Sequence, residues 1–158
     1  MKRPYCAYFL IGYPGTGQTQ FRGLLTKFQA HKGWYVFSVD AVLQKMADER
    51  KVSVFSLYND HMEIVTQKLN ESMKRIIDMR NNVIFDMPDL LSRAQRKQRL
   101  TIIPKEYMRR AVVFTPPLDV PNHLKTLGIV QNEMLKAPFE PATIEEGFDE
   151  VRPYNLLT

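Results

Sequence analysis

A glycine-rich loop that follows an apolar run constrains this chain more than any other feature. The apolar run covers Tyr5–Ile11, and the loop reads Gly12-Tyr13-Pro14-Gly15-Thr16-Gly17-Gln18-Thr19. Its glycines allow backbone conformations that other residues resist, so successive N–H groups can point inward and bind an anion. The helix expected after the loop directs its N-terminal dipole at the same anion. We therefore expect a phosphate group to bind at this loop.

One position departs from the pattern of phosphate-binding loops. The spacing matches G-x-x-x-x-G-K-[ST], but Gln18 stands where that pattern has a lysine. A glutamine amide donates a hydrogen bond but carries no charge, so it cannot replace the lysine at the β- and γ-phosphates. Thr19 offers a hydroxyl to Mg²⁺. We expect ATP and Mg²⁺ as cofactors, with weakened phosphate binding, at Gly12, Pro14, Gly15, Thr16, Gly17, Gln18 and Thr19.

Apolar runs alternate with segments of helical periodicity along the chain. This alternation predicts an α/β fold of three layers, α/β/α, with a central parallel sheet. Lys51–Leu57 is compatible with a loop or a short ordered turn. The expected strands are Tyr5–Ile11, Trp34–Val39, Val83–Phe85, Arg110–Phe114 and Val151–Tyr154, and the expected helices are Thr19–His31, Asp40–Arg50, Asn59–Arg80, Arg93–Ile103, Asp119–Leu127 and Ile129–Lys136.

Two carboxylates follow expected strands. Ligands of open parallel sheets bind at the carboxyl ends of the strands, where Asp40 and Asp86 would meet the glycine loop. Asp40 is a candidate general base, although an aspartate at a helix start is often only an N-cap. Asp86 is a candidate Mg²⁺ ligand together with Thr19, although an aspartate two residues before Pro88 also suits a turn.

Basic residues are concentrated between Asp89 and Arg110, where seven basic residues face two acidic ones. The net charge of the whole chain is also +5, so the rest of the sequence is balanced. Such a segment suits a phosphate-rich partner, but it also suits a helix face exposed to solvent. The candidate cations for the transferred phosphate are Arg93, Arg96, Lys97 and Lys125, and the first three are also candidates for nucleic-acid binding.

Length and composition indicate an ordinary globular chain. Its 158 residues fit one domain, 1–158. No run approaches the ~18 apolar residues of a membrane span, and the short N-terminal run enters a glycine loop instead of a cleavage site, so we expect no secretory leader. The single cysteine, Cys6, fits a cytoplasmic protein. The three histidines lack metal-ligand spacing, so a zinc site is not expected.

The order of these features resembles bacteriophage-type polynucleotide kinases, which are small P-loop kinases also described as AAA-like ATPases. The resemblance covers nearly the whole chain. It rests on the glycine loop, Asp40, the VIFD run ending at Asp86, the basic helix, and the FEPATIEEGFDEV segment from Phe139 to Val151. It implies a P-loop kinase-like fold and transfer of the γ-phosphate of ATP to a nucleic-acid hydroxyl, with Asp40 as the base. The implied acceptor is DNA more than RNA, at a 5′ end or on a hydroxymethylated base.

The chain departs from this family where positive charge is expected. Gln18 replaces the loop lysine, Leu43 stands where an arginine often follows the catalytic aspartate, and the lid-like region 122–131 has only Lys125 as a lysine or arginine. One hypothesis is therefore a weakened phosphotransferase. The alternative is a non-catalytic pseudokinase that binds nucleic acid or a protein partner. A third hypothesis is a kinase for nucleoside monophosphates or other small molecules, against which the basic helix argues mildly.

Overall fold

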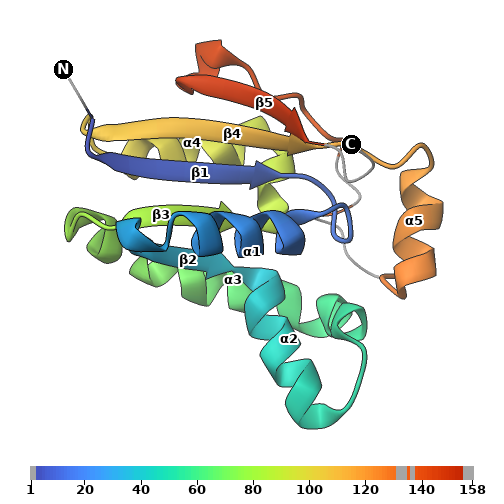
Figure 1. Ribbon diagram of the computed structural model, residues 1–158. Coiled ribbons are helices and arrows are strands. Elements are labelled where there is room, and N and C mark those ends of the chain that lie inside the picture. Colours follow the sequence, from blue (N-terminus) through green and yellow to red (C-terminus); the bar gives the residue numbers. More distant parts are fainter. Residues whose placement is uncertain (1–2, 131–134, 136–137, 155–158) are drawn as a thin grey trace.

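A five-stranded sheet forms the centre of the protein (Figure 1). The computed structural model describes residues 3–130, 135 and 138–154. All neighbouring strands pair in parallel, in the order β2-β3-β1-β4-β5. This arrangement confirms the predicted α/β fold with a central parallel sheet. The strands are β1 (Tyr5–Ile11), β2 (Trp34–Ser38), β3 (Asn82–Asp86), β4 (Tyr107–Phe114) and β5 (Glu150–Tyr154).

Helices cover both faces of the sheet. In Figure 1, α1 lies in front of the sheet, whereas α3 and α4 lie behind it. Within the described residues no helix is long and apolar enough to cross a membrane. The helices are α1 (Gln18–Phe28), α2 (Val39–Arg50), α3 (Val54–Asp78), α4 (Arg93–Ile102) and α5 (Val120–Leu127), and short 3₁₀ helices cover Ala30–Lys32, Pro88–Leu91 and Ile144–Glu146.

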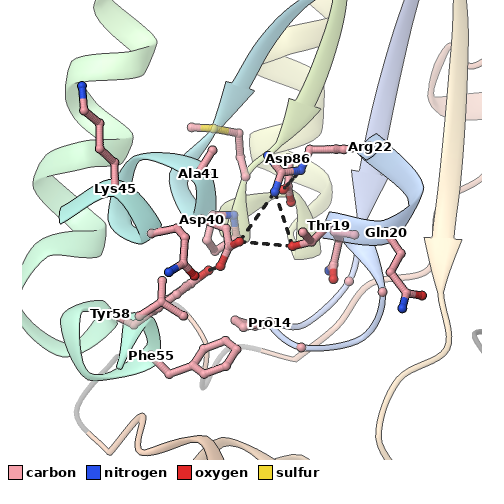
Figure 2. Close-up of a pocket in the computed structure, with 18 of the residues that line it drawn as sticks. Pro14, Thr19, Gln20, Arg22, Asp40, Ala41, Lys45, Phe55, Tyr58 and Asp86 are labelled. Carbon is pink, nitrogen blue, oxygen red and sulfur yellow. Dashed lines mark hydrogen bonds and ion pairs between the residues drawn. The ribbon is translucent and has the colours of Figure 1, made fainter. Parts of the chain in front are cut away.

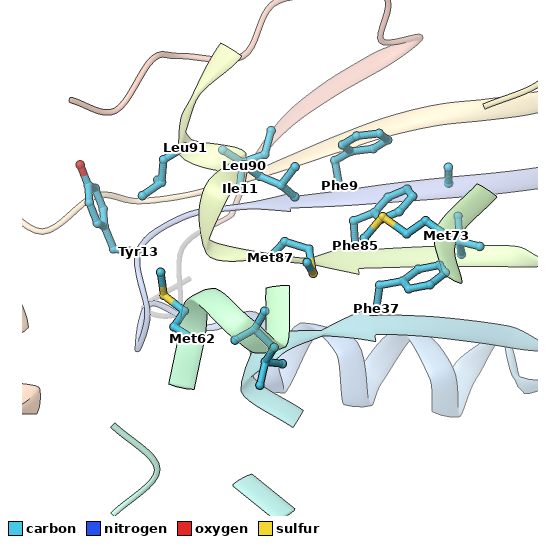
Figure 3. Close-up of a cluster of buried hydrophobic side chains, with 14 of the residues drawn as sticks. Phe9, Ile11, Tyr13, Phe37, Met62, Met73, Phe85, Met87, Leu90 and Leu91 are labelled. Carbon is cyan, nitrogen blue, oxygen red and sulfur yellow. The ribbon is translucent and has the colours of Figure 1, made fainter. Parts of the chain in front are cut away.

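Alternation of side chains along the strands creates two apolar clusters, one on each face. Phe9 of β1 and Phe85 of β3 face α3 and belong to the larger cluster, with their ring centroids 4.9 Å apart (Figure 3). The neighbouring residues Leu10 and Ile84 point to the other face, where they pack with Leu25 of α1. The sheet is thus buried on both faces, which holds the carboxyl ends of its strands in fixed positions.

The boundaries of several elements differ from the predicted ones. α3 begins at Val54, so most of the ambiguous segment Lys51–Leu57 is helical, and α2 is separated from it by Lys51 in a left-handed conformation. β4 begins at Tyr107, because the whole of β1 pairs with it from Tyr5↔Tyr107 onward. Most of the expected helix Ile129–Lys136 lies outside the described residues.

Candidate functional site

The carboxyl ends of β1, β2 and β3 surround a cleft of about 680 Å³. The glycine loop follows β1, Asp40 lies just after β2, and Asp86 ends β3 (Figure 2). Phe55 and Tyr58 of α3 line the same cleft. The sheet topology therefore brings the predicted loop and both predicted carboxylates together, at the edge of the sheet where α/β proteins bind ligands.

The backbone of the loop requires glycine at more than one position. Gly15 has φ 77° and Gly17 has φ 121°, in the region where side chains are disfavoured. Gly17 directly precedes α1, so the loop leads into the helix N-terminus, as the motif requires. A Cβ at Gly12 would lie 2.8 Å from the Cβ of Phe114 and 2.9 Å from the amide nitrogen of Gln18. The loop is therefore packed tightly against β4 and against its own side chains.

Gln18 folds back into the loop instead of extending toward a ligand. Its Nε2 donates a hydrogen bond to the carbonyl oxygen of Tyr13 at 2.9 Å. The Thr16 hydroxyl lies 2.7 Å from the same carbonyl and 3.2 Å from Oε1 of Gln18. The Gln18 side chain is buried. Neutral hydrogen bonds thus brace the loop at the position where the family pattern has a lysine.

Asp40 is available for chemistry because another residue caps its helix. Ser38 is the N-cap of α2 and accepts a hydrogen bond from Ala41 N at 3.0 Å. Asp40 lies in the first turn, so the N-cap interpretation of this residue is wrong. Its Oδ1 accepts a hydrogen bond from the Tyr58 hydroxyl at 2.9 Å, and its Oδ2 accepts one from the Thr19 hydroxyl at 3.2 Å. These two contacts fix the carboxylate beside the loop.

Arg22 of α1 and Tyr58 of α3 are site residues that the sequence interpretation missed, and Arg22 is the charged one. Its Nε lies 3.0 Å from Oδ2 of Asp86, and its Nη2 lies 3.6 Å from Oδ2 of Asp40. Nη2 also donates a hydrogen bond to the Thr19 hydroxyl at 3.3 Å. The available signal was its spacing: Arg22 follows Gln18 by four residues, so both side chains lie on one side of the helix. A cation is therefore present at the site, one helical turn after the position of the missing lysine.

Burial and charge control the ionisation of two groups in the cleft. Burial raises the pKa of Asp86 to about 6; Arg22 opposes this rise, Asp40 adds to it, and the hydrogen bond from Ser38 opposes it. Burial, followed by the charges of Asp40 and Asp86, raises the pKa of Tyr58 well above its ordinary value. Tyr58 therefore stays protonated and remains a hydrogen-bond donor to Asp40.

The predicted phosphate cations Arg93 and Lys125 do not line this cleft, in contrast to the prediction. The Arg93 side chain is exposed and lies 3.9 Å from Glu146. Lys125 borders a second cavity of about 490 Å³ together with Tyr13 and residues of α5. From α5, it is His123 that contacts the loop, with its Nε2 2.8 Å from the carbonyl oxygen of Pro14.

Arg96 is a structural residue, which corrects its prediction as a nucleic-acid contact. Its side chain is fully buried, and its Nε and Nη2 bind both carboxylate oxygens of Glu146 at 2.8 and 3.2 Å. Arg99 of the same helix is also buried and lies 2.7 Å from Asp89. Only Arg93 and Lys97, of the three predicted nucleic-acid contacts, are exposed. Sequence spacing did not reveal the burial, because Glu146 lies fifty residues away from Arg96.

The predicted metal ligands have suitable chemistry but already contact a cation. Carboxylates and hydroxyls are the hard oxygen ligands that Mg²⁺ prefers. Arg22, however, contacts both Thr19 and Asp86, the two predicted ligands. Within the described part of the chain, no cluster of three or more His, Cys, Asp or Glu side chains has the arrangement of a metal site. The residues do not fit Mg²⁺ while the guanidinium remains between them.

Comparison with known proteins assigns the family. The AAA domain profile matches residues 8–123. The chain belongs to this family of AAA domains. The match covers the glycine loop, Asp40 and Asp86, so the predicted P-loop fold is confirmed. AAA and other P-loop domains typically bind a nucleotide with Mg²⁺.

The remaining comparisons add little. No curated protein matches the chain. One similar solved structure comes from a study of the PezAT chromosomal toxin–antitoxin system of the human pathogen Streptococcus pneumoniae, with 12% identity and a TM-score of 0.49. The match covers 69% of this chain and 46% of that chain. The chain therefore spans less than half of that protein.

Proposed function

We propose that this AAA domain transfers the γ-phosphate of ATP to a nucleic-acid hydroxyl, with weakened turnover. The arrangement of Asp40 is the observation that supports this most. Its carboxylate lies in the cleft, held by Tyr58 on one oxygen and Thr19 on the other, next to the loop that suits a phosphate. A general base must be held in a fixed position near the transferred phosphate, and the two hydrogen bonds of Asp40 beside the loop support this role.

The proposed reaction is an in-line displacement at phosphorus. The acceptor oxygen forms a bond to the γ-phosphorus while the bond from that phosphorus to the β,γ-bridging oxygen breaks. The proton of the acceptor hydroxyl passes to Asp40, and ADP leaves with the electron pair of the broken bond. The N–H groups of the loop and the Arg22 guanidinium supply the positive field that such a transfer requires.

A nucleic-acid acceptor is favoured by the resemblance to polynucleotide kinases and by exposed positive charge. Arg93 and Lys97 of α4 are exposed, and Lys45 of α2 lines the cleft itself. Exposed cations attract a polyanionic strand, although of these three only Lys45 lines the cleft. DNA is the proposed acceptor more than RNA, in keeping with the kinases that the sequence resembles.

The test is transfer from labelled ATP. The acceptors are a 5′-hydroxyl oligonucleotide, DNA with hydroxymethyluracil, and a nucleoside monophosphate. The wild-type chain and Gln18→Lys are expected to label an oligonucleotide, with faster labelling by the variant, whereas Asp40→Asn is expected to be at least about 100-fold slower than wild type. Absence of transfer by both the wild-type chain and Gln18→Lys would refute the catalytic proposal. Labelling of the monophosphate alone would refute the nucleic-acid acceptor.

A second candidate is a non-catalytic domain that binds nucleotide, nucleic acid or a protein partner. Gln18 favours it, because its side chain carries no charge and hydrogen-bonds within the loop, so position 18 lacks the cation that the phosphate-binding pattern supplies. This candidate predicts an ATP-dependent or DNA-dependent rise in melting temperature without transfer to any acceptor. Transfer by the wild-type chain at a rate abolished by Asp40→Asn would exclude it.

A further inference from the structure

We propose that Arg22 is a built-in cation of the cleft, which occupies the place of a divalent metal and lets nucleotide phosphates bind without one. The nucleotide part of this inference rests on the proposed function. The metal part concerns only the apo protein and is tested without nucleotide. No family pattern in the sequence identifies this residue; its place among the three oxygen-bearing side chains does.

The distances show that the guanidinium and a metal cannot share the position. The oxygens of Asp86, Thr19 and Asp40 lie 3.0, 3.3 and 3.6 Å from guanidinium nitrogens. A hard divalent cation binds such oxygens at about 2.0–2.6 Å. An ion bound to these three oxygens would therefore lie against the guanidinium and face its charge. Arg22 must leave before a metal can enter.

Burial strengthens this competition. The side chain of Arg22 is 13% exposed, and those of Asp40 and Asp86 are 21% and 10% exposed. Charges with little solvent around them attract one another more strongly than exposed charges do. Two carboxylates without Arg22 would form an uncompensated anionic pair, which attracts divalent cations. With Arg22 present, most of that attraction is already satisfied.

The hydrogen bonding of Arg22 is also incomplete, so the guanidinium keeps donor capacity for an anionic ligand. Its Nε faces Asp86 without hydrogen-bond alignment, although this atom is buried. The side chain lines the cleft together with the glycine loop. Because Gln18 contributes no charge, Arg22 is the cation that α1 brings to the part of the cleft where the loop meets the carboxylates.

The experiment compares the wild-type chain with Arg22→Met and with Lys27→Met as the matched control. Lys27 lies on the same helix but is exposed, so its replacement removes an equal charge away from the cleft. Mn²⁺ is titrated without nucleotide and followed by its paramagnetic resonance signal. ATP binding is then measured by calorimetry, once in excess EDTA and once in excess Mg²⁺.

We expect Arg22→Met to bind Mn²⁺ at least about tenfold more tightly than the wild-type chain and Lys27→Met, because two carboxylates lose their counter-ion. The wild-type dissociation constant for ATP should change by less than about threefold between EDTA and Mg²⁺. In Arg22→Met, ATP binding should weaken by at least about tenfold in EDTA and recover in Mg²⁺.

Two wild-type results overturn the inference. They are Mn²⁺ binding as tight as in Arg22→Met, and ATP binding that requires Mg²⁺. If Arg22→Met does not fold, the wild-type chain still decides, because micromolar Mn²⁺ binding or Mg²⁺-dependent ATP binding refutes the proposal. If no chain binds ATP in either buffer, nucleotide binding is refuted, and the Mn²⁺ titration alone decides whether Arg22 excludes the metal.

Discussion

Arg96 of α4 and Arg22 of α1 both lie beside buried carboxylates, yet their surroundings differ. Arg96 uses all its nitrogens: Nε and Nη2 bind Glu146, Nη1 binds the carbonyl of Leu90, and no cavity adjoins it among the described pockets. Arg22 lines the cleft, and among the described residues its side chain donates one hydrogen bond, to Thr19, while its ion pairs are less well aligned. A saturated guanidinium fastens segments together, whereas an incompletely paired one at a cleft keeps charge for a ligand.

The same difference separates the basic segment that contains α4 from the single arginine of the cleft. The basic segment from Asp89 to Arg110 concentrates positive charge, but its Arg96 and Arg99 form buried ion pairs with Glu146 and Asp89. A buried ion pair is weak support for net stability, but losing one partner leaves the other charge buried alone. Substitutions in the two regions should therefore affect different quantities. A substitution of a buried arginine in α4 should lower the free energy of unfolding, and a substitution in the cleft should change binding or transfer.

The largest effect is expected from Arg96→Met. This change leaves Glu146 buried without its partner and should lower the free energy of unfolding by about 3–5 kcal/mol. Urea unfolding followed by circular dichroism measures it. Lys97→Met, an exposed neighbour on the same helix, should stay within about 0.5 kcal/mol of wild type. Equal effects of the two changes would show that the buried ion pair of Arg96 holds the fold no more strongly than an exposed basic residue does.

Asp40→Asn tests the other side of the comparison. Loss of a general base should slow labelling of the acceptor by at least about 100-fold. The asparagine oxygen can still accept the Tyr58 hydrogen bond, so the free energy of unfolding should change by less than about 1 kcal/mol. Transfer assays and urea unfolding are measured on the same preparation. A destabilised variant that retains wild-type turnover would mean that Asp40 is a structural residue like Arg96.

Gln18→Lys tests whether the cleft lacks positive charge at position 18. A lysine adds a charged donor to the loop and should tighten ATP binding about tenfold, since a hydrogen bond to a charged group contributes about 1.5–3 kcal/mol. Calorimetric titration with ATP measures the change. Lys27→Met serves again as a charge control outside the cleft. Unchanged affinity would show that Arg22 already supplies the charge that position 18 lacks.

The smallest effect is expected at a partly exposed pair, Arg3 and Asp149. Burial alone would raise the pKa of Asp149, but the Arg109 N–H hydrogen bond and the Arg3 side chain outweigh it and lower the pKa. A lowered folded-state pKa stabilises the fold above the unfolded value and loses this effect as the pH falls through the folded value. Asp149→Asn should therefore cost about 1 kcal/mol at pH 7 and progressively less below about pH 4.

Unfolding of wild type and Asp149→Asn at pH 7 and at acidic pH provides the measurement. The two unfolding free energies should differ at pH 7 and converge in acid. A difference that grows as the pH falls would contradict the assigned sign. A cost as large as that of Arg96→Met would show that partial exposure does not weaken such pairs in this protein.

Several features were predictable because they depend on local sequence. β1 was predicted with its observed ends, and the spacing of the glycines placed a phosphate loop between a strand and a helix. The position of Asp40 and Asp86 beside the loop follows from the rule that ligands of parallel sheets bind at the carboxyl ends of the strands. In each case the backbone pattern alone fixes where the residue lies, since neighbours in the chain determine strands, loops and helix starts.

Which arginine lies in the cleft was decided by tertiary structure. Arg22 gave no stronger sequence signal than Arg96, and only the fold placed the first between Asp40 and Asp86 and the second against Glu146. The reason is physical. A long arginine side chain can pair with a carboxylate on a distant segment, and the sequence does not show which carboxylate the fold will bring to it. The sequence by itself determined the loop and the strand ends, and packing between distant segments decided which arginine lies in the cleft.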